Sequence, residues 1–301
     1  MHTTEQTLEE KWGDLDTCSY WLEADDGGRI AITRIAADPK LPKRAAVVLV
    51  PGMFSNRHFW VSPKGIGLAA AVAAAGSPVW LIERRGLGRS GKPDKARAGL
   101  NEHLHVDLPL VQKHVQGIDP GPAIWGGHSF GGVIATRAVA ETLDSRLIGG
   151  LLLFAAQVEV DKKLLCWPWN LYLRAIARLF GRFPSRKLGL GPEDEPIAAI
   201  DDACTWRMNT QRGGNLLAPL VNIHCPVFAF AGGADDRDPP AGCEKLLSHM
   251  SSPDKRYVLL SKNNGYSQDY DHPGIVVSKA AAKEVWPQVV DWLAKLPLQA
   301  Q

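Results

Sequence analysis

The stretch Gly127-His128-Ser129-Phe130-Gly131 decides the fold, because it stands between an apolar strand and an apolar helix. The sequence Pro-Ala-Ile-Trp at 122–125 predicts a buried strand, and residues 132–140 predict a helix. A serine at a tight strand-to-helix turn is lifted clear of the sheet, with its hydroxyl presented to a substrate. The strained turn leaves space only for small residues two positions away, which Gly127 and Gly131 supply. The strand and helix around this short motif make it a specific signal for a nucleophilic Ser129.

The rest of the chain alternates between strand and helix patterns. Residues 18–23 and 29–35 predict two strands joined by a turn at Asp25-Asp26-Gly27-Gly28. Further strands are expected at 45–50, 79–82, 148–156, 227–231 and 256–260, and helices at 65–75, 102–115 and 278–296. This alternation predicts an α/β protein with a mostly parallel, doubly wound sheet, an antiparallel start and helices on both faces.

The alternation stops between Gln157 and Asn222, where aromatic residues are mixed with arginines. We expect this stretch to be a helical cap inserted over the site, with residues 1–156 and 223–301 forming the core. The pattern at 170–180 predicts an amphipathic helix. Three roles are open for its apolar residues: packing on the body of the protein, lining an acyl pocket, and contact with a membrane surface. The segment 189–195 is expected to be an ordinary exposed bend.

A serine hydroxyl needs a base to take its proton, usually a histidine held by a carboxylate. The apolar run 227–231 ends at Gly232-Gly233, so an acid just beyond it lies at the carboxyl edge of the sheet. The spacing from Gly232 to Pro240 favours Asp235 as that acid, with Asp236 and Asp238 as alternatives.

The base candidate is His272, which follows the last predicted strand and a polar loop. The resulting chain order of serine, acid and histidine is the order found with this kind of serine turn. His128 lies inside the motif and is expected to serve packing instead.

These motifs resemble the α/β-hydrolase family over about 19–296, and within it bacterial esterases and lipases. The resemblance rests on the serine turn, the loops around Asp235 and His272, the segments 50–54 and 85–90, and the closing segment 281–293. It implies an α/β-hydrolase fold and a Ser129-His272-Asp235 triad. It also implies an oxyanion hole, formed by the backbone N–H of Phe130 and a second donor from the turn Pro51-Gly52-Met53-Phe54. Met53 is the first choice for that second donor and Phe54 is the alternative.

Composition fits a soluble enzyme of one large α/β domain with an insertion. The chain has 301 residues, 45% of them hydrophobic and 22% charged, and a net charge of +2. This balance predicts neither a nucleic-acid partner nor stable membrane insertion. The five cysteines lack C-x-x-C spacing, the first sixteen residues are polar, and no run reaches the roughly 18 apolar residues of a membrane span. We therefore expect a cytoplasmic protein.

Together these features predict a serine hydrolase that cleaves carboxylic esters of small molecules through an acyl-enzyme, without metal or organic cofactor. Thioesterases, peptidases, C–C hydrolases and acyltransferases share the same triad, and a non-catalytic ligand-binding protein of this fold is a further alternative. The Pro51–Phe54 turn also resembles that of polyhydroxyalkanoate polymerases, but these use cysteine where this chain has Ser129. The natural substrate, the acyl length, any cap movement and the oligomeric state stay open.

Overall fold

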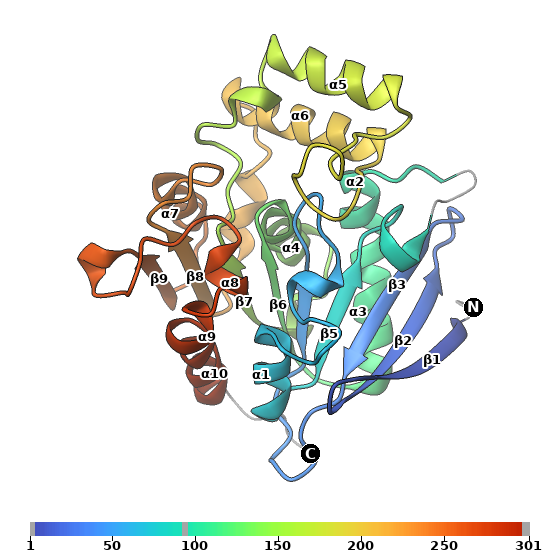
Figure 1. Cartoon of the computed structure of the whole chain (residues 1–301), viewed down its shortest axis with the longest axis vertical. Coiled ribbons are helices and arrows are strands. Elements are labelled where there is room, and N and C mark those ends of the chain that lie inside the picture. The colour runs from blue at the N-terminus through green and yellow to red at the C-terminus, as the bar shows by residue number, and fades with distance from the viewer. Residues whose placement is uncertain (1–3, 92–95, 297–301) are drawn as a thin grey trace.

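A nine-stranded sheet runs through the computed structural model, which describes residues 4–91 and 96–296. The strands lie in the order β1-β2-β3-β5-β4-β6-β7-β8-β9 (Figure 1). Their bounds are β1 Thr4–Trp12, β2 Leu15–Glu23, β3 Arg29–Ile35, β4 Val47–Val50, β5 Val79–Glu83, β6 Ala123–His128, β7 Ile148–Phe154, β8 Val227–Gly232 and β9 Lys255–Leu260.

The strands from β4 to β9 pair in parallel, whereas β1, β2 and β3 pair antiparallel, and β3 also joins β5 antiparallel. This confirms the predicted mostly parallel sheet with an antiparallel start. The edge strand β1 was not predicted, because its sequence is largely polar. An edge strand with one solvated face accepts such side chains, and Trp12 at its end is buried in the core cluster that also contains Val61 and Leu68.

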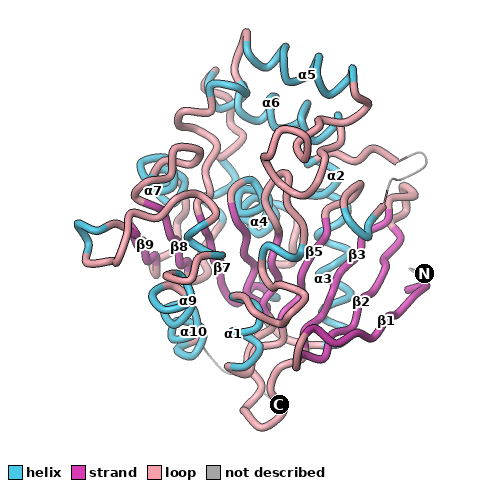
Figure 2. The backbone as a smooth tube through the Cα atoms, in the orientation of Figure 1, coloured by secondary structure: helices cyan, strands magenta, loops and turns pink. Residues whose placement is uncertain are grey.

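Both faces of the central strands are buried, which explains their continuous apolar sequences. In β4, Val48 and Val50 pack with the helices α3 and α4, whereas Val47 and Leu49 pack with α1 and α10 on the other face. Figure 2 shows the strands running through the middle of the molecule with helices on either side. The helices of the body are α1 Leu68–Ala74, α2 Leu100–Glu102, α3 Leu108–Ile118, α4 Phe130–Glu141, α7 Pro240–Ser248, α8 Gly274–Val277, α9 Ala281–Glu284 and α10 Trp286–Lys295.

Two predicted helices are broken in the structure. The helix expected at 102–115 has a wider π-type turn at His103–Asp107 before α3 begins. Pro109 has no N–H to donate and its ring crowds the carbonyl one turn back, so the regular hydrogen-bond ladder is interrupted there. The helix expected at 278–296 is divided between α9 and α10, with Pro287 in the first turn of α10.

The segment 157–222, hereafter the insertion, lies between β7 and β8 and carries the helices α5 (Trp169–Leu179) and α6 (Ile197–Gln211). These helices pack together beyond the ends of the strands (Figure 1). Their small apolar core contains Ala177, Phe183, Ile200 and Cys204 and contacts Met53 and Phe54 of the body. Within the described ranges, no helix combines the length and apolarity needed to cross a bilayer.

Candidate active site

Ser129 sits at a strained turn between β6 and α4. Its backbone has φ 55°, a left-handed value that a non-glycine residue rarely adopts. A Cβ on Gly131 would stand 2.4 Å from the carbonyl oxygens of Val50 and Pro51, and a Cβ on Gly127 would stand 2.5 Å from the Gly131 carbonyl carbon. Both positions therefore require glycine. The Ser129 side chain is left at the rim of the sheet, with 9% of the residue exposed.

Asp235 and His272 come from neighbouring loops beyond β8 and β9 and meet directly. The backbone N–H of Ala234 donates to the Tyr270 carbonyl at 2.9 Å, which joins the two loops. His272 Nδ1 lies 2.8 Å from Asp235 Oδ2. The other oxygen, Asp235 Oδ1, accepts the backbone N–H groups of Arg237 and Asp238 at 2.9 and 2.8 Å. These bonds fix the carboxylate in the orientation that holds an imidazole ring by its Nδ1–H.

The two alternative acids occupy different environments. Asp236 is exposed, whereas Asp238 is fully buried beside Ser129. Ser129 Oγ donates to Asp238 Oδ2 at 2.9 Å, and this same oxygen lies 3.7 Å from His272 Nδ1. Lys162 Nζ lies 2.6 Å from Asp238 Oδ1, so this carboxylate is paired with a cation.

The hydroxyl of Ser129 is thus directed to a carboxylate rather than to the imidazole. The described residues show no hydrogen bond between Ser129 Oγ and the His272 ring, although the sequence predicts one. A serine hydroxyl has a single proton and turns about one bond, and an ionised carboxylate is the stronger acceptor. Catalytic hydrogen bonds often form only when substrate is bound, so His272 stays the base candidate.

His128 contributes more than packing. Its Nε2–H donates to the backbone carbonyl of His272 at 2.8 Å, and its ring lies between those of Phe59 and His272, at 4.4 Å from each centroid. Burial, followed by repulsion from a charged His272, holds the pKa of His128 well below its usual value. A neutral His128 therefore supports the loop that presents His272. The sequence indicated only an interior position for this residue.

The turn after β4 runs beside Ser129. A Cβ on Gly52 would stand 3.2 Å from the Ser129 Cβ. The N–H groups of Met53 and Phe130 have no hydrogen-bond acceptor within residues 4–91 and 96–296. The N–H of Phe54, the alternative donor, is already given to Glu195 Oε1 at 2.6 Å. Of the two candidates in this turn, only Met53 has its N–H free.

Glu195 reaches this turn from the insertion, and it forms a buried ion pair with Arg84. Arg84 Nη2 also donates to the Gly52 carbonyl at 3.2 Å, so the pair is bonded to both sides of Met53. The expectation of an ordinary exposed bend at 189–195 is therefore wrong for Glu195, which has no exposed surface. The local sequence gives no sign of this, because the partners are more than 100 residues away along the chain.

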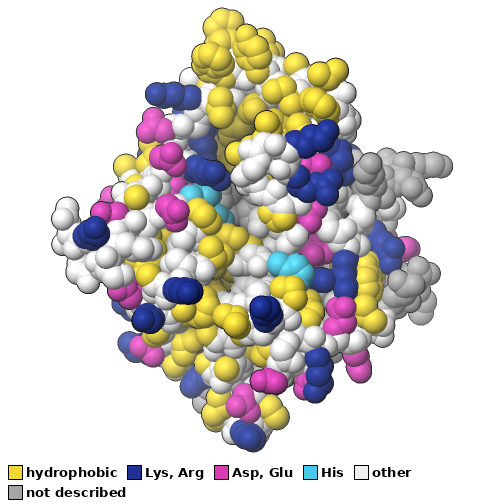
Figure 3. Space-filling view, viewed as in Figure 1, with side chains coloured by type: hydrophobic (Ala, Val, Ile, Leu, Met, Phe, Trp, Pro, Cys, Tyr) yellow, Lys and Arg dark blue, Asp and Glu magenta, His cyan; other side chains and the backbone are white. Residues whose placement is uncertain are grey.

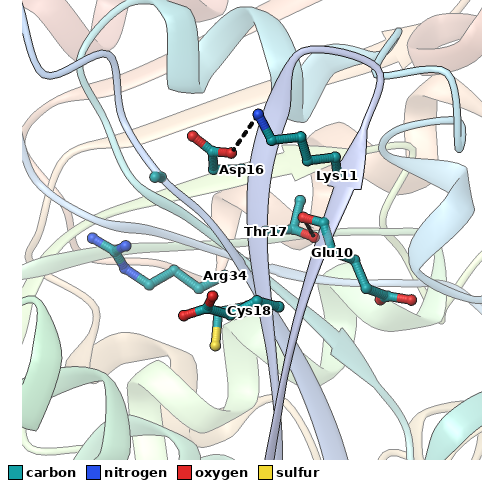
Figure 4. Close-up of a pocket in the computed structure, with 8 residues that line it drawn as sticks. Glu10, Lys11, Asp16, Thr17, Cys18 and Arg34 are labelled. Atoms are coloured by element: carbon teal, nitrogen blue, oxygen red, sulfur yellow. Dashed lines mark hydrogen bonds and ion pairs between the residues drawn. The ribbon is translucent and has the colours of Figure 1, made fainter.

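No candidate metal site accompanies these residues: the described part of the chain holds no cluster of three or more His, Cys, Asp or Glu side chains suited to a metal ion. A hollow of about 460 Å³ lies far along the sheet, beside β1 and β2 (Figure 4). It is lined by Glu10, Lys11, Asp16, Cys18 and Arg34, among others, and by none of the candidate site residues.

Comparison with known proteins supports the fold described above. The sequence profile of the alpha/beta hydrolase family matches residues 47–280, so the chain belongs to the α/β-hydrolase family. No curated protein matches the sequence.

Solved structures show the same fold at low sequence identity. A thermophilic esterase from Thermogutta terrifontis is similar with a TM-score of 0.65 and 17% identity, over 92% of this chain and 98% of that one. A structure from work on carboxylesterases of Nitrososphaera gargenis is similar with a TM-score of 0.63 and 16% identity, over 91% of this chain and 97% of that one. The putative non-heme bromoperoxidase BpoC from Mycobacterium tuberculosis is similar with a TM-score of 0.58 and 17% identity, over 89% of this chain and 96% of that one. At these identities the likeness concerns the fold and leaves the reaction open.

Proposed function

We propose that the protein is a serine hydrolase that cleaves carboxylic esters of small molecules through an acyl-enzyme. The observation that carries this proposal is the 2.8 Å contact between His272 Nδ1 and Asp235, next to the strained Ser129. The free N–H groups of Met53 and Phe130 support it, because they offer two donors for a developing oxyanion. The esterases among the structural neighbours agree with this assignment.

In the proposed reaction, Ser129 Oγ turns from Asp238 to His272 and attacks the acyl carbon as its proton passes to His272 Nε2. Asp235 accepts Nδ1–H and stabilises the imidazolium. The N–H groups of Met53 and Phe130 hold the oxyanion, each contributing about 3–4 kcal/mol. The C–O bond to the alcohol then breaks, and the alcohol leaves with the proton from His272. A water molecule activated by His272 attacks the acyl carbon, which releases the acid and restores Ser129.

Several reactions share this machinery. Thioester, amide and C–C bond cleavage and acyl transfer use the same nucleophile and base, and the residues over the site decide among them. A ligand-binding protein without catalysis would need no activated serine. We propose that the reaction requires no cofactor, and a cytoplasmic location, which five free thiols fit.

The test is covalent labelling and turnover by matched serine variants. A fluorophosphonate should label the wild type on Ser129, and p-nitrophenyl esters of increasing chain length should be hydrolysed. Ser129→Ala should abolish labelling and lower kcat by about 10⁴-fold or more, since the nucleophile is lost. Ser145→Ala, at an exposed serine on the body, is the control and should behave as wild type. Ester turnover retained by a folded Ser129→Ala variant would refute the mechanism.

A further inference from the structure

The outward side of the insertion exposes a cluster of large apolar side chains. Eight of the fourteen large hydrophobic residues exposed in the described chain lie between 164 and 188, and Trp167 and Leu179 are 72% and 79% exposed. We call this cluster the outer cap surface; it consists of Leu164, Trp167, Trp169, Leu171, Tyr172, Leu179, Phe180 and Leu188. Figure 3 shows the matching concentration of hydrophobic side chains at the end of the molecule formed by α5. Single exposed apolar residues are common on proteins, but a cluster of this size marks a contact surface.

Helix α5 is apolar over most of its circumference, and folding covers only part of this apolar surface. Leu173 and Ala177 pack into the small core of the insertion, together with Ile176. Trp169, Leu171, Tyr172 and Leu179 of the same helix stay more than half exposed. The packing of this chain therefore does not account for the outer residues.

The same segment is strongly basic. Residues 162–192 contain seven Lys or Arg residues and no Asp or Glu, although the whole chain has a net charge of only +2. Asp201 pairs with Arg174 and Arg178, and Asp194 pairs with Arg186. Among the described residues, the exposed Lys163 and Lys187 have no carboxylate partner; Lys187 stands 5.4 Å from the centre of the Phe180 ring. Cations thus border the apolar cluster.

We propose that the outer cap surface docks on an anionic lipid surface. Aromatic and aliphatic side chains exposed on a helix, with lysine and arginine beside them, suit the boundary between lipid headgroups and acyl chains. A second copy of this chain is a poorer partner, because a symmetric pairing through this surface would bring the same cations face to face. Binding would be peripheral, since no described helix suits a membrane span.

The experiment measures co-sedimentation of the full chain with vesicles. One set contains phosphatidylcholine and phosphatidylglycerol in a ratio of about 3:1, and the other contains phosphatidylcholine alone. The wild type should bind the anionic vesicles at least tenfold more tightly, and binding should weaken as salt is raised, because salt screens the headgroup charge. Ser129→Ala should bind as wild type does, so this result is independent of the proposed reaction.

Matched charge substitutions locate the surface. The double variant Trp169→Glu and Leu179→Glu should lose at least tenfold in affinity for the anionic vesicles. The control is the double variant Ile66→Glu and Val277→Glu, which makes the same change at exposed apolar residues outside the insertion and should bind as wild type. The proposal is overturned if the wild type ignores anionic vesicles, or if both double variants bind alike. It is equally overturned if sedimentation velocity shows a dimer that only the Trp169/Leu179 variant loses, without vesicle binding by the wild type.

Discussion

The rim of the sheet around Ser129 and the insertion above it are held together by different kinds of contact. At the rim, the contacts are between backbone atoms. Gly131 lies against the backbone of Pro51, and a backbone hydrogen bond joins the loop of Asp235 to the loop of His272. The insertion packs Ala199, Ala203 and Trp206 against the main core, and it also forms ion pairs with the body, including Glu195 with Arg84 and Asp202 with Arg97. The comparison shows that backbone contacts between strand ends fix the rim, whereas side-chain packing and ion pairs between residues far apart in the sequence hold the cap.

The largest effect in this comparison is expected at the rim, from Asp235→Asn. This change should lower kcat by about 10³–10⁴-fold, because an amide holds the imidazole in the wrong tautomer and does not stabilise its charged form. Asp236→Asn, at the exposed neighbour, is the control and should retain near wild-type kcat. Steady-state kinetics on one ester decides the matter. If Asp238→Asn proves more damaging than Asp235→Asn, the acid has been assigned to the wrong carboxylate.

A smaller effect is expected where the two regions meet, at Glu195. Glu195→Ala removes the acceptor for Phe54 N–H and leaves Arg84 buried without its partner. We expect a loss of about 10–100-fold in kcat with a lesser change in KM, as the oxyanion turn loosens, and a destabilisation of about 3–5 kcal/mol. The values of kcat and KM are measured at a temperature where circular dichroism shows the variant folded, and urea unfolding measures the loss of stability.

Two further variants sharpen this test. Glu195→Gln keeps an oxygen acceptor for Phe54 N–H and should recover part of kcat. Glu193→Gln changes a nearby carboxylate that accepts from the Asn56 side chain at 2.7 Å, and it should leave kcat unaltered. Equal kcat values in folded Ala and Gln variants of Glu195 would mean that this side chain serves stability alone.

The smallest effect is expected away from both regions, at His114 on α3. Burial lowers the pKa of His114 below its usual value, so the unfolded chain binds more protons there than the folded protein does. This contribution lowers stability as pH falls through about 6.5 toward the folded pKa, with a slope of at most about 1.4 kcal/mol per pH unit. His114→Phe should therefore lose less stability than wild type between pH 7.5 and 5. Urea unfolding at each pH measures this, and the two proteins should show equal slopes between pH 7.5 and 9.

The comparison of the rim with the insertion also explains which structural features could be predicted from the sequence. The sheet, its antiparallel start and the loops that bring Asp235 to His272 could be predicted, because apolar runs and glycine turns are local signals. The breaks in the two predicted helices lie near Pro109 and Pro287, and a proline inside a helical pattern is likewise a local signal. Glu195, Lys162 and the bond from Ser129 to Asp238 could not be predicted, because each depends on partners brought together only by the folded chain.

The pairing of Lys162 with Asp238 makes the charge next to Ser129 depend on the insertion. Lys162 belongs to the first residues of that segment, and it balances a carboxylate that lies in contact with the serine hydroxyl. Drawing the lysine away would leave an uncompensated anion 2.9 Å from Ser129 Oγ. An acyl group ending in its own carboxylate would then be repelled, while a neutral one would be little affected. If the protein acts as proposed, the position of Lys162 would therefore affect which acyl groups can approach Ser129.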